Sequence, residues 1–376
     1  MNNYSIIQKA KPGELKAWSN LSDLARSSVF PLFEIATPKD SWLQGKVARQ
    51  SGDGTALSIE RSLIGIKAAL GGITSPFSLD FSSWRSNEQT KQGESVVSFA
   101  YQRAISMGLD PILCVNYGAW IDPIYSEACE SLAMPASIIR LENSALQDSR
   151  ESGLVLDSVT EIVETLGLPT NGANVLVDFG SVANLDQAAA LERCVSLTEE
   201  LNNISVSRFV VAGTSIPRSV TGVAQEGGHA KIRRKEYALW LQLRATQPEA
   251  NWGFSDYGVR PTATSADQIA PHANAKIYYS GKNNVHLFRG KSQQKESKNI
   301  QFPKLAREVI GRNLYEGSNY SFGDKSIGEA AKSATYNGSL MEWIAITQNH
   351  HATLVTEQVE EVIAVEAALR RINAAH

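Results

Sequence analysis

Residues 174–179 read Asn-Val-Leu-Val-Asp-Phe, a short apolar run that carries one carboxylate near its end. Continuous apolarity without alternation is typical of a strand buried on both faces, as in a parallel sheet. Seven other short runs share this composition. In chain order the eight predicted strands are residues 4–9, 29–35, 77–81, 110–116, 137–141, 174–179, 208–213 and 251–257.

The segments between these runs have the periodicity of amphipathic helices. Segment 152–166 carries apolar residues every three or four positions and ends before Gly167, a common helix stop. The predicted helices are residues 14–27, 58–70, 95–107, 121–132, 152–166, 185–201 and 231–243. Strand and helix alternate over about 260 residues, which predicts an α/β fold of the (β/α)8 TIM-barrel type. A doubly wound open sheet is the alternative, although segment 11–14 after the first strand lacks the glycine-rich phosphate fingerprint.

The composition changes after the eighth predicted strand. Residues 275–280 and 285–289 predict a hairpin, and the charged segment 290–299 predicts a mobile loop. Further helices are expected at residues 303–313, 325–333, 341–349 and 353–372. We therefore expect a barrel core over residues 1–262, and over residues 263–376 an elaborated last loop with a hairpin and closing helices. Both belong to one structural unit.

Composition and charge exclude several classes of protein. The 376 residues are 43% hydrophobic, with 36 basic and 39 acidic side chains and a net charge of -3. This excludes wholesale disorder and argues against a surface coated in positive charge for nucleic acid. Three scattered cysteines, Cys114, Cys129 and Cys194, fit a reducing compartment. No apolar run approaches the roughly 20 residues that span a bilayer, so we expect a cytoplasmic protein without a membrane partner.

Charged or polar residues end nearly every predicted strand. Active sites of (β/α)8 barrels lie at these carboxyl ends, so the side chains there are the candidates for function. They are Lys9 with Lys11, Glu34, Asp80, Asn116, Arg140 with Glu142, Asp178, Thr214 with Ser215, and Asp256 with Tyr257. Converging charges carry a desolvation cost that proteins usually retain for function. In the alternative interpretation, ion pairs such as Lys9–Glu34 or Asp80–Arg140 only stabilise the rim.

Positive and negative side chains occur together at the predicted strand ends, which suggests chemistry on an anionic ligand. The candidate catalytic residues are Glu34, Asp80, Asp178 and Asp256, and the last three are also candidate ligands of Mg²⁺ or Mn²⁺. Cations beside them favour a phosphate-bearing ligand. The candidate ligand-binding residues are Lys9, Lys11, Arg140, Ser215, Tyr257, Arg289, His350 and His351. A sugar or nucleotide site without turnover, or a glycosidase carboxylate pair, fits the same residues.

Motifs along nearly the whole chain resemble those of the phage and prophage beta protein family. They occur in order at residues 9–14, 31–35, 177–180, 212–217, 234–237, 254–258, 288–290, 322–324 and 349–351. The sequence departs from the family pattern at Leu79-Asp80-Phe81, where Val-Asp-Leu is expected, and at Tyr237, where Trp is expected. The resemblance implies a setting of prophages or antiphage defence and no particular reaction. It also implies that Arg289, Asp324, His350 and His351 belong with the barrel, as candidates for a lid over its mouth.

Two hypotheses of different classes follow. In the first, a barrel protein of phage–host conflict binds a nucleotide or nucleic acid in a polar mouth, and a divalent metal could then serve phosphoester hydrolysis. In the second, a non-catalytic protein recognises a phage or host protein through the hairpin and the loop at 290–299. A barrel that has lost an ancestral activity, with rim charges that neutralise one another, is a third interpretation. The sequence predicts no oligomeric state.

Overall fold

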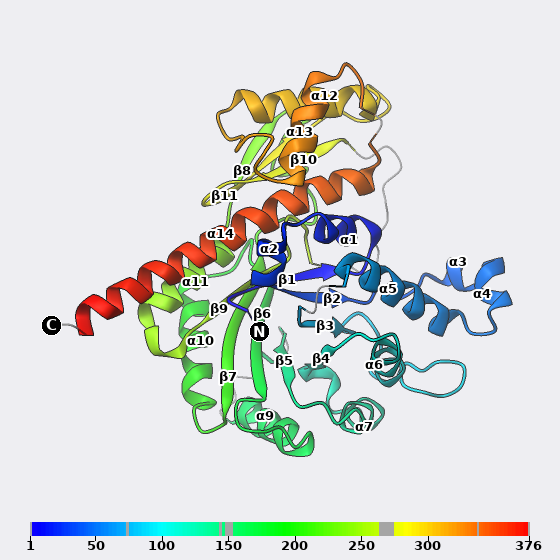
Figure 1. The fold of residues 1–376 in the computed structure, drawn as a ribbon, viewed down its shortest axis with the longest axis vertical. Coiled ribbons are helices and arrows are strands. Elements are labelled where there is room, and N and C mark those ends of the chain that lie inside the picture. Colours follow the sequence, from blue (N-terminus) through cyan, green and yellow to red (C-terminus); the bar gives the residue numbers. More distant parts are fainter. Residues whose placement is uncertain are drawn as a thin grey trace.

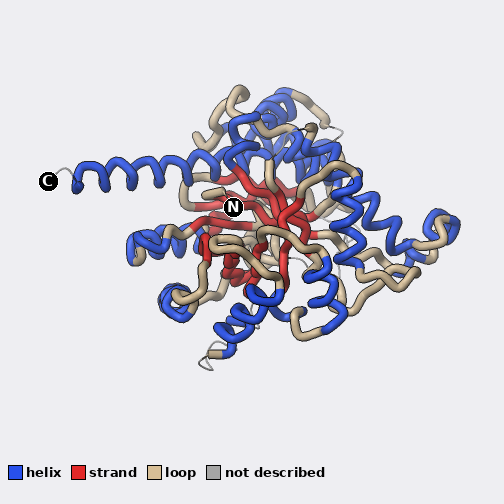
Figure 2. The backbone as a smooth tube through the Cα atoms, turned by 60° about the horizontal axis from the view of Figure 1, so that its bottom comes forward, coloured by secondary structure: helices blue, strands red, loops and turns tan. Residues whose placement is uncertain are grey.

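The computed structural model describes residues 2–72, 75–142, 145–146, 153–262, 274–336 and 338–374. Eight parallel strands within these residues close into a barrel, in the order β1-β2-β3-β4-β5-β6-β7-β9. This confirms the predicted (β/α)8 fold, and Figure 2 shows the strands in the centre with helices around them. The barrel strands are β1 (Tyr4–Lys9), β2 (Val29–Glu34), β3 (Phe77–Asp80), β4 (Pro111–Asn116), β5 (Ser137–Leu141), β6 (Ala173–Ser181), β7 (Val206–Thr214) and β9 (Gly253–Asp256).

Helices and short helical turns cover the outside of the barrel. Several begin at side-chain caps, such as Asp53, whose carboxylate accepts the amide of Ala56, and α5 ends at Gly71 with a positive φ of 60°. The elements of this layer are α1 (Pro12–Ser19), α2 (Asp23–Ser28), α5 (Gly54–Leu70), α6 (Val96–Ser106), η1 (Tyr117–Ala119), α7 (Pro123–Ser131), α9 (Leu154–Thr165), α10 (Gln187–Glu200), α11 (Lys235–Thr246) and η2 (Pro248–Ala250). The short helices α3 (Asp40–Leu43) and α4 (Lys46–Gln50) lie beyond α5, away from the barrel (Figure 1).

Alternate residues of each strand face opposite sides of the barrel wall. One buried cluster consists of strand residues that face the interior, such as Leu32 of β2 and Leu176 of β6, together with Tyr257 just after β9. Their neighbours, such as Phe33 and Val177, pack outward against the helices. Because the side-chain period of a strand is two, this alternation decides which residue at each strand end points into the mouth.

A small second sheet lies beside the barrel. Strands β10 (Lys276–Ser280) and β11 (Asn284–Arg289) form the predicted antiparallel hairpin, and β8 (His229–Arg233) pairs with β11. Strand β8 corrects the prediction of a helix from residue 231, since the helix α11 begins at Lys235. Helices α12 (Lys298–Gly311) and α13 (Phe322–Lys332) pack on this sheet (Figure 1). Residues 298–299 of the predicted mobile loop belong to α12.

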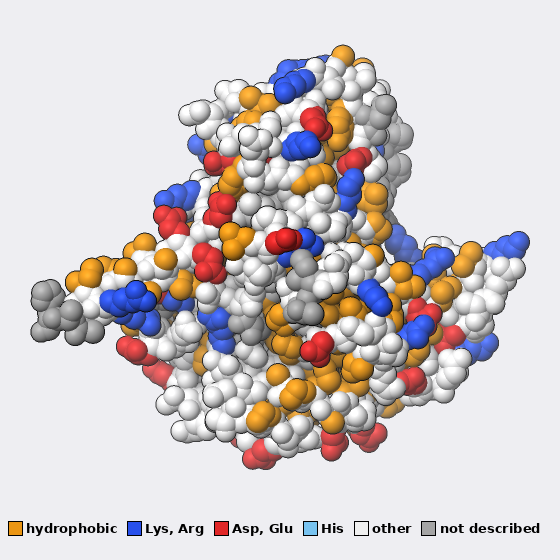
Figure 3. All heavy atoms as spheres, viewed as in Figure 1, with side chains coloured by type: hydrophobic (Ala, Val, Ile, Leu, Met, Phe, Trp, Pro, Cys, Tyr) orange, Lys and Arg blue, Asp and Glu red, His pale blue; other side chains and the backbone are white. Residues whose placement is uncertain are grey.

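The chain ends in one long helix, α14 (Leu340–Ala374), where two helices were predicted. The two predicted helices are continuous because no glycine or proline interrupts residues 340–374. α14 runs between the small sheet and the barrel and packs on α1, α13 and β10 (Figure 1). Its far end leaves the body of the protein and exposes Val365, Leu369 and Ile372 (Figure 3). None of the described helices is long and apolar enough to cross a membrane.

Candidate functional site

Five barrel strands direct a polar side chain from their carboxyl ends toward Arg140, the last inward-facing residue of β5. Glu34, Asp80 and Asn116 end β2, β3 and β4 on the inward side, Asp178 lies in the last part of β6, and Tyr257 follows β9. All these side chains are buried, and that of Arg140 is 3% exposed. We call Glu34, Asp80, Arg140, Glu142, Asp178 and Tyr257 the Arg140 cluster. Parallel strands close the ring, so the sequence expectation of a shared polar mouth holds for these residues.

The guanidinium of Arg140 bridges two aspartates. Its Nη1 lies 2.8 Å from Oδ2 of Asp80, while Nη2 and Nε lie 2.6 Å and 3.0 Å from Oδ2 of Asp178. Tyr257 completes the bridge, because its hydroxyl accepts from Nη2 at 2.8 Å and donates to Asp178 at 2.5 Å. The planar guanidinium group, with its N–H donors in one plane, therefore holds the carboxylates of Asp80 and Asp178 in fixed positions.

Hydrogen bonds to Asp80 keep its carboxylate ionised. Burial by itself would raise the pKa of Asp80, but Arg140 and donors from Ser82 and Asn116 lower it below the usual value. The donor atoms are Oγ of Ser82 at 2.6 Å and Nδ2 of Asn116 at 2.9 Å. Asp80 is therefore a fixed negative charge at the centre of the mouth.

Two further carboxyl groups of the cluster behave differently. Oε1 of Glu34 lies 3.5 Å from Nη2 of Arg140, and Oε1 of Glu142 lies 3.3 Å from Nε. Burial raises the pKa of each to about 7, although Arg140 opposes the shift. With pKa values near 7, both groups are present in neutral and ionised forms at neutral pH.

The raised pKa of Glu34 predicts a pH-dependent effect of the substitution Glu34→Gln. A carboxyl group whose pKa is higher in the folded state favours folding at low pH, and this contribution is lost as pH rises through about 7. We expect the stability of Glu34→Gln relative to wild type to increase by roughly 2 kcal/mol from pH 5 to pH 8. Urea denaturation at both values measures it. Glu164→Gln, on the exposed face of α9, controls for the loss of a surface carboxylate, and an equal change in that variant would contradict the assignment.

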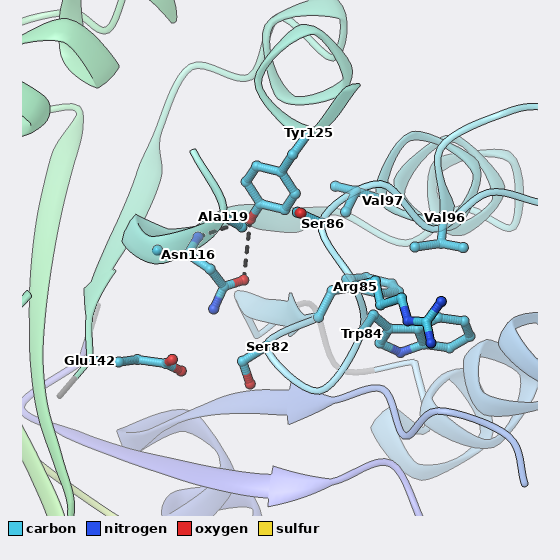
Figure 4. A pocket seen from close by; sticks show the side chains of 12 residues that line it. Ser82, Trp84, Arg85, Ser86, Val96, Val97, Asn116, Ala119, Tyr125 and Glu142 are labelled. Atoms are coloured by element: carbon cyan, nitrogen blue, oxygen red, sulfur yellow. Dashed lines mark hydrogen bonds between the residues drawn. The ribbon is translucent and has the colours of Figure 1, made fainter. Parts of the chain in front are cut away.

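A cavity of about 200 Å³ opens beside the cluster at the ends of β3, β4 and β5. Glu142 and Ser82 lie on one side of it, and Trp84 and Arg85 on the other (Figure 4). Tyr125 is fixed between them, since its hydroxyl contacts the amide and the side-chain oxygen of Asn116 at 2.9 Å and 3.2 Å. The side chain of Glu142 is 40% exposed, so a ligand in the cavity can reach its carboxyl group.

Asp256 does not join the Arg140 cluster. It follows the inward-facing Ser255 and precedes the inward-facing Tyr257, so its side chain points out of the barrel wall toward α14. There its carboxylate accepts from the hydroxyl of Tyr4 at 2.9 Å and contacts Nε2 of His351 at 2.8 Å. The predicted metal ligands Asp80, Asp178 and Asp256 are consequently not brought together. Among the described residues, no group of three or more His, Cys, Asp or Glu side chains is placed to hold a metal ion.

The two predicted histidines lie within α14 and are buried away from the mouth. Nδ1 of His351 contacts Oγ of Ser280 at 2.6 Å, so this imidazole connects β9 to β10. Nδ1 of His350 contacts Oδ2 of Asp324 at 2.9 Å, and its Nε2 contacts the carbonyl of Ser280 at the same distance. The residues expected to form a lid instead join the barrel to the C-terminal elements.

The other predicted ligand-binding residues are dispersed around the rim. Ser215 donates to Glu236 at 2.5 Å and accepts the amide of Lys235, so it stabilises the start of α11. Lys9 lies opposite Glu34 in the β1–β2 register and lowers its pKa against the effect of burial. Lys11 and Lys9 act in the same sense on Glu14. Arg289 lies at the end of β11 and donates to the carbonyl of Ala224 at 2.6 Å.

The family model named Beta protein matches residues 4–357, nearly the whole chain. The chain belongs to the Beta protein family. This confirms the resemblance drawn from the sequence motifs, and the match includes both the barrel and most of α14. No curated protein matches the chain.

Three residues that the motifs of the Beta protein family did not single out contribute to the cavity. Trp84, Arg85 and Tyr125 come from the β3–α6 loop and from α7, where no strand end marks them. An aromatic and a basic residue in the loop directly after a barrel strand, such as Trp84 and Arg85, indicate a ligand site in the sequence, because these loops form the catalytic face of such barrels.

Proposed function

We propose that the barrel mouth is an active site in which Glu142 exchanges a proton with a small polar ligand bound in the adjacent cavity. The observation that carries this proposal is the position of Glu142: it lines the cavity, and its pKa is raised to about 7. A carboxyl group with a pKa near the working pH is present in both protonation states and can act as acid or base. The other ionised carboxylates of the cluster have no comparable opening to the cavity.

The ligand class that we propose first is a phosphate-bearing molecule, with phosphoester hydrolysis as the reaction. Arg85 supports this class, because it is the exposed cation on the cavity wall. Arg140 is engaged by Asp80 and Asp178, so its role here is to position carboxylates. Burial, which Arg140 opposes, raises the pKa of Glu142. A Mg²⁺ or Mn²⁺ ion in the cavity would take Glu142 as a protein ligand, since Glu142 is the carboxyl group among the residues that line it.

Glu142→Gln tests the acid–base role directly. We expect turnover of 4-nitrophenyl phosphate or bis(4-nitrophenyl) phosphate, measured with and without Mg²⁺ or Mn²⁺, to fall about 100- to 10,000-fold, the usual contribution of a general acid or base. Glu127→Gln, on the exposed face of α7, is the matched control and should keep full activity. Equal rates in wild type and Glu142→Gln would contradict the proposal, and so would the absence of turnover and of nucleotide binding by wild type.

The proposed setting is phage–host conflict, which the match to the family does not test. If the reaction in the barrel mouth protects the cell, phage should form fewer plaques on cells that carry the wild-type gene than on cells that carry Glu142→Gln. Equal protection by both would favour the alternative, a non-catalytic recognition protein, and a partner captured from infected cells would then identify what it binds.

A further inference from the structure

A group of cations lies on the face of the small sheet that is turned toward the barrel. Lys276 and Arg289 are directly opposite each other in the β10–β11 pair, so their side chains share one face of the sheet. Two positions along β10, Tyr278 is on that face and packs with residues of the loops after β7 and β9, including Ile216 and Val259. The opposite face, with Ile277 and Phe288, packs on α12 and α13.

Arg260 adds a third cation from the barrel side. It comes directly after β9, where its amide donates to the carbonyl of Tyr257. Its charge acts on both residues of β10 that face it: burial lowers the pKa of Lys276, and Arg289 and Arg260 lower it further. Burial raises the pKa of Tyr278 to about 12, although Arg260 and Arg289 act to lower it. Three positive charges thus converge at the seam between the small sheet and the barrel loops.

Two carboxylates of the described residues lie near this seam, and they compensate its positive charge only in part. Glu14 lies 3.5 Å from Arg260, and Glu226 is paired with Lys295 at 2.8 Å. No carboxylate of the described residues forms an ion pair with Lys276 or Arg289. The Arg289 side chain, on a residue only 9% exposed, leaves its Nε without a hydrogen-bond partner in that part of the chain. The buried Arg289 and the half-buried Lys276 repel each other, and such a pair of like charges is costly unless an anion compensates it.

We propose that Arg260, Lys276 and Arg289 form a binding site for a small phosphate-bearing molecule at the seam between the small sheet and the loops after β7 and β9. Besides their contacts with Glu14 and with the carbonyl of Ala224, the guanidinium groups of Arg260 and Arg289 have further N–H donors for an anion. Lys276 offers a mobile point charge, and the hydroxyl of Tyr278 supplies a neutral donor. In many (β/α)8 barrels the loops after the last two barrel strands bind phosphate, and here the small sheet supplies the cations for that position. The site is independent of the proton exchange proposed for Glu142.

Lys276→Gln is the informative substitution because no described residue forms a hydrogen bond or ion pair with this side chain. Without ligand, the variant should be as stable as wild type or more stable, since it removes repulsion between like charges. Calorimetric titration with pyrophosphate and with a nucleoside diphosphate should give binding by wild type that is weakened at least about tenfold in Lys276→Gln. The phosphate-induced rise in the melting temperature of wild type should be lost in the variant.

Controls separate this site from the mouth and from general electrostatics. Lys295→Gln removes an exposed lysine of the same region and should bind pyrophosphate like wild type, as should Glu142→Gln. Arg289→Lys retains the charge but loses the fork, so it should bind with intermediate affinity. No pyrophosphate binding by wild type, equal binding by Lys276→Gln, or binding only of a single-stranded oligonucleotide would each overturn the proposal.

Discussion

Arg140→Met is expected to lower the free energy of unfolding by at least about 3–5 kcal/mol, because it removes the cation that four carboxyl groups share. The Arg140 side chain is 3% exposed and lies within 3.5 Å of Glu34, Asp80, Glu142 and Asp178. Methionine fills much of the volume but leaves these carboxyl groups without the cation that they share. Urea denaturation of the wild type and the variant at pH 8, above the pKa of about 7 of Glu34 and Glu142, measures the largest difference.

Neutralising the aspartates should restore the stability lost with Arg140. In Arg140→Met combined with Asp80→Asn and Asp178→Asn, no fixed negative charge of the bridge remains, so the triple variant should be more stable than Arg140→Met alone. Arg140→Lys retains a positive charge but cannot reach both aspartates in the same plane, and we expect an intermediate loss. A loss below about 1 kcal/mol in Arg140→Met would mean that the cluster is solvated rather than buried.

Much of the Arg140 cluster could be predicted from sequence because a parallel barrel places every strand end in one ring. Apolar runs without alternation identified the strands, and the residue after each run identified Glu34, Asp80, Arg140 and Asp178. Their ionic pairing, the alternative interpretation of the rim, is also present, since Asp80 and Arg140 are in direct contact. Pairing and function are compatible here, because burial raises the pKa of Glu142 to about 7 even though Arg140, which pairs with Asp80, opposes this shift.

Three predictions from the sequence were wrong, each for its own physical reason. Asp256 was grouped with the mouth because it stands at a strand end, but the side-chain period of two turns it outward and turns Tyr257 inward. Strand β8 was read as the start of a helix because a short edge strand with polar residues has little apolar signal, and its partner β11 comes more than fifty residues later. His350 and His351 were placed between helices on polarity alone, yet histidine does not break a helix.

Separating Asp256 from His351 should detach the C-terminal elements from the barrel. The neutral imidazole of His351 donates from Nε2 to Asp256 and accepts at Nδ1 from Ser280, which fits a pKa lowered by burial. Both side chains are 1% exposed, so truncation of either leaves a buried polar atom of the other without its hydrogen-bond partner. We expect Asp256→Ala and His351→Ala each to cost about 3 kcal/mol or more, and a double-mutant cycle to give a coupling of roughly 1.5–3 kcal/mol.

The region in which hydrogen exchange rises shows whether the Asp256–His351 pair holds α14 on the barrel or only adds to the overall stability. Hydrogen exchange of Asp256→Ala should increase first in the small sheet and α14, while the barrel strands remain protected, because the pair connects these two parts. Lys16 and Glu342 provide the matched control: they join α1 to the same helix at 3.0 Å, but both side chains are more than a third exposed. Their coupling should stay below about 1 kcal/mol. Equal coupling in the two cycles, or exchange that rises uniformly over the barrel, would show that Asp256 and His351 do not hold α14 in place.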